Sequence, residues 1–235
     1  MIISFKYKFI FIKTYKTAGS SIENYIFPHL NNKDIIAPTE DYPGFNCWGD
    51  FETKGLDQYF PHKDLEKKIK LNLKFFAHMP IWLVKERLEP LSQKINFDIF
   101  NNFYKFGVIR NPYDALVSHY YWINSNLSIP ISFNQILDDL SANTFPNHGL
   151  LNFNRLTDRC FENVICDKII KFENLNEELG LVFDRLKIPF KGNLNIFKKK
   201  SNRKGRYQDF YNLDSKKIVE EIFWKEMRLF NYKFN

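Results

Sequence analysis

The chain has 235 residues, 44% of them hydrophobic and 17% aromatic, so it can bury one substantial core, and we expect one domain over residues 1–235. The net charge of +7 suits an anionic ligand, a nucleic acid or an acidic membrane face. Three widely spaced cysteines argue against a disulfide framework or a zinc site. No apolar run approaches the ~18 residues of a transmembrane helix. The N-terminus is not typical of a signal peptide, so we expect a cytoplasmic protein.

The N-terminal part predicts a strand followed by a helix. The largely apolar run over residues 5–13 is typical of a strand. Ser20, followed three residues later by Glu23, forms a capping box, so we expect a helix that begins there and ends near Leu30. Residues 31–73 begin with a stretch rich in proline and glycine and predict a long excursion from the fold.

Two more strands are predicted in the middle of the chain. Residues 73–80, "LKFFAHMP", predict a short strand that Pro80 ends, and a helix follows to about Leu91. Residues 103–110, "FYKFGVIR", predict a third strand, and Pro112 suits the first turn of the helix after it.

The C-terminal part continues the alternation. Residues 164–175, "VICDKIIKFENL", predict a fourth strand. An amphipathic helix is expected from Asp214 onward, with Ile218, Val219, Ile222, Phe223, Met227 and Phe230 at helical spacing. Strands alternating with helices predict an α/β protein with a three-layer, P-loop-like fold, in which helices flank a central, mostly parallel sheet.

Three of the predicted strands each lead into a residue that can carry chemistry. The first strand runs into Lys16, the second into His78 and the third into Arg110. Ligands of open parallel sheets bind outside the C-terminal ends of the strands. We therefore expect these three side chains to lie along one edge of the sheet.

The loop between the first strand and the first helix has the features of a phosphate site. It consists of Lys16, Thr17, Ala18, Gly19, Ser20 and Ser21. Gly19 lets the backbone approach a ligand, the opening N–H groups of the helix are donors, and Lys16 adds a positive charge. An ordinary strand-to-helix turn with a solvated lysine is the alternative. The pattern G-x-x-x-x-G-K-[ST] is absent and no predicted strand ends in a clear carboxylate for Mg²⁺, which disfavours a Walker-type ATPase or kinase.

These motifs resemble those of sulfotransferases that use 3′-phosphoadenosine 5′-phosphosulfate (PAPS). "KTYKTAGSSIE", residues 13–23, resembles their 5′-phosphosulfate loop. Arg110 and Ser118, eight residues apart in "VIRNPYDALVSHYYW", are similar to their second signature. "FFAHMP", residues 75–80, is similar to the segment that carries the base activating the acceptor in many members.

The likeness covers residues 8–235 except 31–73 and favours the carbohydrate and bacterial branch of the family. The segments "IIKFENL" and "RKGRYQDFYNL" also fit the family outline. One departure is Tyr15, which stands where the family usually has proline before the lysine.

The resemblance implies a role for each cofactor segment. Lys16 would contact the 5′-phosphosulfate and stabilise the charge that grows on the leaving oxygen. The rest of its loop would hold the 5′-phosphate, while Arg110 and Ser118 would hold the 3′-phosphate. Arg203, Lys204 and Gly205 form an Arg-Lys-Gly triplet that would also meet the 3′-phosphate; a solvated basic loop is the alternative for this triplet.

The resemblance also implies that His78 is the general base. An unperturbed imidazole has a pKa of ~6.5, so it is ready to accept a proton near neutral pH. A capping or structural histidine is the alternative.

The predicted function is transfer of a sulfuryl group from PAPS to an acceptor hydroxyl, with a glycan as the expected acceptor. A P-loop type phosphoryl-transfer enzyme is the first alternative, although it has no need of a second phosphate site. A Mg²⁺ requirement would favour this alternative, because the resemblance implies that sulfuryl transfer needs no catalytic metal, and we expect none. A basic nucleic-acid binder is the second, and no nucleic-acid-binding signature supports it. Residues 31–73 and 122–160 are the expected acceptor loops.

Overall fold

The computed structural model describes residues 1–31, 34–37, 75–125, 127–142, 150–195, 203 and 205–235. Within them a five-stranded sheet has the strand order β3-β1-β2-β4-β5. The strands are β1 (Ile2–Ser4), β2 (Phe9–Ile12), β3 (Ile35–Ile36), β4 (Tyr104–Ile109) and β5 (Lys168–Lys171). β2, β4 and β5 are parallel neighbours, and β1 runs antiparallel to β2 and β3.

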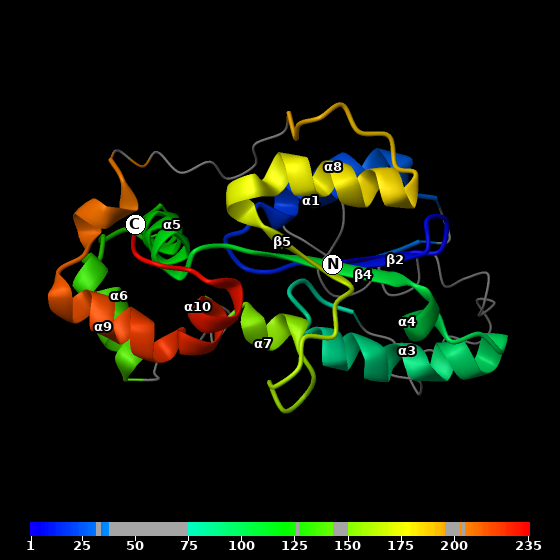
Figure 1. The fold of residues 1–235 in the computed structure, drawn as a ribbon, viewed down its shortest axis with the longest axis horizontal. Coiled ribbons are helices and arrows are strands. Elements are labelled where there is room, and N and C mark those ends of the chain that lie inside the picture. Colours follow the sequence, from blue (N-terminus) through cyan, green and yellow to red (C-terminus); the bar gives the residue numbers. More distant parts are fainter. Residues whose placement is uncertain (32–33, 38–74, 126, 143–149, 196–202, 204) are drawn as a thin grey trace.

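Helices cover both faces of this sheet (Figure 1). They are α1 (Gly19–Ile26), η1 (Phe27–His29), α3 (Ile81–Ile95), α4 (Ile99–Asn102), α5 (Pro112–Asn124), α6 (Phe133–Ser141), α7 (Phe153–Leu156), η4 (Phe172–Asn174), α8 (Leu175–Leu186), η5 (Tyr207–Phe210), α9 (Leu213–Ile222) and α10 (Trp224–Phe230). None of the helices in the described part of the chain is both long enough and apolar enough to cross a membrane. The expected α/β fold, with a mostly parallel sheet flanked by helices, is confirmed.

The side chains of β2 alternate between two buried cores, as a strand with both faces covered requires. Phe9 and Phe11 pack with residues of α1 and α8 on one face. Ile10 and Ile12 pack with residues of α3 and α4 on the other. Gly107 in β4 lies beneath α7, where an added Cβ would overlap Leu156 Cδ2, so the missing side chain lets α7 pack on the sheet.

A third core lies beyond the end of the sheet, where α5, α6 and α9 gather (Figure 1). Tyr113 of α5 is fully buried there, and its ring centroid lies 5.1 Å from that of Tyr211 and 4.9 Å from that of Phe234. The Tyr211 hydroxyl also donates a hydrogen bond to the Tyr113 carbonyl at 2.8 Å. These contacts fix the chain segment after residue 203 against α5.

The N-terminus is a hairpin rather than the single strand expected over residues 5–13. Residues 5–8 form a turn, and Lys8 takes a φ of 54°. The carboxylate of Asp34 accepts hydrogen bonds from the N–H groups of Phe5 at 2.6 Å and Lys6 at 3.0 Å. This carboxylate satisfies the turn's backbone donors and ends the strand, an interaction that local sequence does not reveal.

The predicted capping box is wrong. α1 begins at Gly19, with Ala18 at its N-cap and no side-chain cap, and ends at Ile26. η1 follows it directly to His29, so the helical stretch as a whole ends near Leu30, as expected. The Glu23 carboxylate is instead buried, where it pairs with Lys13 Nζ at 2.6 Å and with the Met1 ammonium. A buried carboxylate requires such cationic partners, and this tertiary requirement overrides the local pattern.

The second predicted strand is also wrong over its described residues. Residues 75–80 are irregular, with a turn at residues 77–78, and His78 takes a φ of 61°; residues 73 and 74 lie outside the described part. Phe75 and Met79 are apolar because they enter the core beside α3. The helix after Pro80 is confirmed, although α3 continues to Ile95.

Two other expectations change in detail. The excursion over 31–73 includes the edge strand β3, and its remaining residues lie almost wholly outside the described part. The closing helix is divided at Phe223 into α9 and α10.

Candidate functional site

The loop after β2 folds tightly against β4. Its backbone takes the left-handed conformation at Lys16 and Ala18, with φ of 59° and 62°. The Thr14 hydroxyl donates a hydrogen bond to the Val108 carbonyl, and Thr14 Oγ1 lies 2.7 Å from Thr17 Oγ1. The Thr17 hydroxyl is buried and stabilises the loop from within.

Gly19 begins α1 at a point where no larger residue fits. A Cβ there would lie 2.7 Å from Lys13 Cγ, because the Lys13 side chain passes beneath the loop to reach Glu23. Ser20 and Ser21 lie in the first turn of α1, the former half-buried and the latter buried. Since no side chain caps this turn, its N–H groups and the helix dipole provide a favourable environment for an anion.

Arg110 follows β4 and joins two loops at the edge of the sheet. Its Nη1 donates to the Lys16 carbonyl at 2.9 Å, and its Nε donates to Asp114 Oδ2 at 2.7 Å. The guanidinium also lies 4.1 Å from the centroid of the Phe172 ring. Burial lowers the pKa of Arg110 and the Asp114 carboxylate opposes this effect, so the guanidinium stays protonated.

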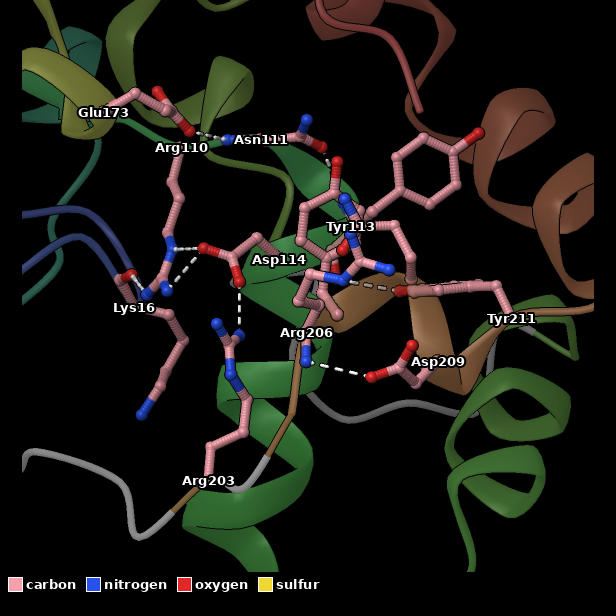
Figure 2. A network of polar contacts seen from close by, with 12 residues as sticks. Lys16, Arg110, Asn111, Tyr113, Asp114, Glu173, Arg203, Arg206, Asp209 and Tyr211 are labelled. Carbon is pink, nitrogen blue, oxygen red and sulfur yellow. Dashed lines mark hydrogen bonds and ion pairs between the residues drawn. The ribbon is translucent and has the colours of Figure 1, made fainter. Parts of the chain in front are cut away.

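Asp114 binds a second guanidinium through its other oxygen. Arg203, which is 89 residues away in sequence, donates from Nη1 to Asp114 Oδ1. Figure 2 shows the carboxylate between the two arginines, with the Lys16 side chain extending on the same side as Arg203. We call Lys16, Arg110, Asp114 and Arg203 the anion edge.

The structure describes only one of the other two residues of the predicted triplet, Lys204 and Gly205. Lys204 lies outside the described residues. Gly205 is exposed, with a φ of 87°, and leads into the turn where Arg206 N donates to Asp209 Oδ2 at 3.0 Å. A residue with a Cβ is disfavoured at this φ, and the added atom would lie 2.9 Å from Asp209 Oδ2.

One face of α5 continues the anion edge. Asp114, Ser118 and Trp122 are spaced four residues apart, so they lie along the same face of the helix. Lys16 Nζ lies 5.4 Å from the centroid of the Trp122 ring. Ser118 is half-buried and lies on this face between Asp114 and Trp122. Its predicted role at the 3′-phosphate stays a prediction.

His78 is held beside the same loop by contacts on two sides. Its Nδ1 lies 3.2 Å from the Lys13 carbonyl oxygen. Because a carbonyl can only accept, Nδ1 carries the proton and Nε2 is the basic nitrogen of the neutral ring. Burial, together with the charges of Lys13, Met1 and Arg155, holds the imidazole pKa well below its usual value, contrary to the ordinary pKa expected from sequence.

The structure thus brings together most of the residues predicted from sequence. Lys16 and Arg110 are in direct contact, and the His78 ring stacks on Tyr15, the residue before Lys16, at 3.8 Å between centroids. Asp114, which contacts both arginines of the anion edge, is the residue of this edge that sequence reasoning missed. Its position four residues after Arg110, in the first turn of a helix, was the available signal.

Comparison with protein families gives one result that covers nearly the whole chain. The description "Sulfotransferase family" matches residues 1–233. Comparisons with curated proteins and with solved structures find no match. The match includes the Lys16 loop, the strand end at Arg110 and the segment of Arg203, the three regions that the fold brings to one edge. The chain belongs to the sulfotransferase family, whose members are transferases that move a sulfuryl group.

Proposed function

We propose that this protein transfers a sulfuryl group from PAPS to a hydroxyl group of a carbohydrate acceptor. The observation that carries the proposal is the anion edge, in which cationic side chains from three distant segments meet beside an uncapped helix N-terminus. PAPS carries two separate phosphate groups, and the edge offers two separate sets of donors. The family resemblance supports the carbohydrate acceptor.

Each set of hydrogen-bond donors would hold a different part of PAPS. The loop of Lys16, Thr17, Ala18, Gly19, Ser20 and Ser21 would hold the 5′-phosphosulfate with its backbone N–H groups and the Lys16 ammonium. The 3′-phosphate would be held by Arg110, Ser118, Arg203, Lys204 and Gly205. Phosphate oxygens match the guanidinium fork well, which makes arginine the suitable residue at the second position.

The reaction uses His78 and Lys16 on opposite sides of the sulfur. The acceptor oxygen attacks sulfur while its proton passes to His78 Nε2. The bond between sulfur and the bridging oxygen breaks, and that oxygen keeps the electron pair as part of the 5′-phosphate. Lys16 stabilises the charge that grows there. The products are a sulfate ester and adenosine 3′,5′-bisphosphate, and the imidazolium then releases its proton to water.

The first experiment compares nucleotides that differ only in the 3′-phosphate. Adenosine 3′,5′-bisphosphate should bind more tightly than AMP by about 1.5–3 kcal/mol, or roughly 10–150-fold, because its extra phosphate makes charge-assisted hydrogen bonds. Isothermal calorimetry measures both affinities. Equal affinity of the two nucleotides would contradict the proposed donor.

A pair of variants tests which residue causes the preference for adenosine 3′,5′-bisphosphate over AMP. Arg110→Ala should abolish the difference between the two nucleotides, whereas Arg228→Ala, at an exposed position on α10, should keep it. Incubation of the wild-type protein with radiolabelled PAPS and a panel of glycans then tests for sulfate-ester formation directly. No labelled product with any hydroxyl acceptor would contradict sulfuryl transfer.

A further inference from the structure

The residue that departs from the family pattern, Tyr15, makes contacts that a proline could not make. Its backbone N–H donates to Asn152 Oδ1 at 2.8 Å, and Asn152 Nδ2 donates back to the Tyr15 carbonyl at 3.0 Å. Proline has no N–H and would leave the buried amide of Asn152 without this partner, which is costly. In this chain a side-chain amide therefore fixes the loop just before Lys16.

The ring of Tyr15 fixes His78. The two rings are stacked, 3.8 Å apart between centroids and inclined by 14°. Arg155 donates to the His78 carbonyl, and its guanidinium lies 4.7 Å from the centroid of the Tyr15 ring. His78 comes from a turn rather than a strand end, so these contacts, with the one to the Lys13 carbonyl, orient its imidazole.

The segment that supplies Asn152 and Arg155 is itself anchored. Asn152 is the N-cap residue of α7, and the buried Glu226 accepts a hydrogen bond from the N–H of Phe153, the first residue of that helix. α7 also packs closely on the sheet at Gly107 through Leu156. The contacts to His78 and Tyr15 thus come from α7, a helix that is itself held in place, and a positioning residue needs such a rigid support.

We infer that Tyr15 is a positioning residue for His78, and that its stacked ring and its amide pair with Asn152 hold the basic Nε2 at a fixed place beside the Lys16 loop. The inference rests on the proposed function, since it assigns Nε2 the role of proton acceptor. We call Tyr15, His78, Asn152 and Arg155 the base side.

Loss of the Tyr15 ring should raise the pKa of the His78 imidazole. The charged or titratable groups around His78 are Lys13, which directly follows β2, the Met1 ammonium, Arg155 of α7 and Tyr15 itself. Three of these are cations, and burial is the largest cause of the lowered imidazole pKa. A smaller side chain at position 15 admits water to the imidazole, so the pKa rises toward its ordinary value.

The test uses four variants of Tyr15 and measures the His78 titration, sulfuryl transfer and nucleotide affinity. Tyr15→Leu and Tyr15→Met remove the aromatic ring but keep the N–H group, Tyr15→Pro removes both, and Tyr15→Phe keeps both. The His78 titration is followed by proton–carbon NMR and assigned by comparison with His78→Gln. The pH dependence of transfer is measured alongside, and Phe97→Leu, at an exposed aromatic outside the site, serves as the control.

In Tyr15→Leu and Tyr15→Met the His78 titration should move to higher pH, and the acid limb of transfer should move with it. Turnover should fall about tenfold, less than the ~10²–10⁴-fold contribution of a positioned general base, because the base is displaced and not removed. The affinity for adenosine 3′,5′-bisphosphate should change less than twofold. Tyr15→Phe should rescue most of the turnover, and Tyr15→Pro should lose the most. Phe97→Leu should match the wild-type protein.

Two results would overturn the inference. One is an unchanged His78 titration in a folded variant without the ring, and Tyr15→Met provides a second such variant if Tyr15→Leu does not fold. The other is a titration that moves while the transfer profile stays in place. If the wild-type protein transfers no sulfuryl group, the proposed function fails, and the titration alone still decides whether Tyr15 controls the imidazole.

Discussion

The anion edge and the base side lie next to each other and are built in different ways. The anion edge depends on charge, since one carboxylate holds two guanidinium groups and one of these reaches the Lys16 backbone. The base side depends on ring stacking and on hydrogen bonds to backbone groups. Cations serve both regions, since they attract an anionic donor at the anion edge and disfavour protonation of the imidazole on the base side, where burial is the larger cause. The two regions therefore differ in burial and in the kind of contact that orders them, not in the sign of the surrounding charge.

The largest expected effect lies on the base side. His78→Gln should lower transfer by ~10²–10⁴-fold, the usual contribution of a positioned general base. Binding of adenosine 3′,5′-bisphosphate should not change, because the phosphates are assigned to the anion edge. Steady-state kinetics and calorimetry measure the two quantities, with His29→Gln as the control.

The wild-type pH profile sharpens the same prediction. Because burial and neighbouring cations lower the His78 pKa, the imidazole stays neutral to a lower pH than a free histidine. Activity should therefore fall on the acid side only below about pH 6.5. An acid limb above that value, or near-normal transfer by His78→Gln, would return His78 to a structural role.

The next largest effect lies on the anion edge. Lys16→Ala should lower turnover by ~10²–10³-fold, because a preorganised contact to developing charge contributes about 2.7–4 kcal/mol to the barrier. The loss in donor affinity should be smaller than the loss in turnover. Single-turnover kinetics at saturating PAPS separate the two, and the exposed Lys217→Ala is the matched control. Unchanged turnover at saturation would show that Lys16 only tethers the donor.

The smallest effect concerns Asp114. Asp114→Asn removes the charge that Arg110 and Arg203 share, so the unfolding free energy should fall by about 1–2 kcal/mol, a modest loss because the groups are partly exposed. Affinity for adenosine 3′,5′-bisphosphate should rise severalfold at low salt and fall more steeply as salt is added. Weaker binding at low salt would show instead that Asp114 helps binding by holding Arg203 in place.

Sequence reasoning succeeds where the position of a residue follows from local structure. Lys16 and Arg110 follow strands that the pattern predicts, and parallel pairing of β2 with β4 brings their loops together. The α/β architecture follows from the same alternation of strands and helices. The domain assignment over residues 1–235 stays a prediction.

Sequence reasoning fails where distant residues decide the outcome. The Tyr15–Asn152 pair joins residues 137 positions apart, and the Asp114–Arg203 pair joins residues 89 apart. Glu23 looks like half of a capping box, yet the buried Lys13 recruits it as a counterion. His78 looks like a strand end because the residues around it are apolar, but their apolarity serves the core beside α3.

Gly107 gives the sheet an indirect influence on the chemistry. Any side chain there would push Leu156 away, and with it the short helix that carries Arg155, at a cost of about 1–3 kcal/mol for overpacking. A substitution in the middle of a strand, in contact with no ligand, would thus misalign His78, the proposed proton acceptor. In a survey of natural or engineered variants, such a change would resemble a loss of catalysis more than a loss of folding. Its cause would be a side chain that fills the space which glycine leaves for Leu156.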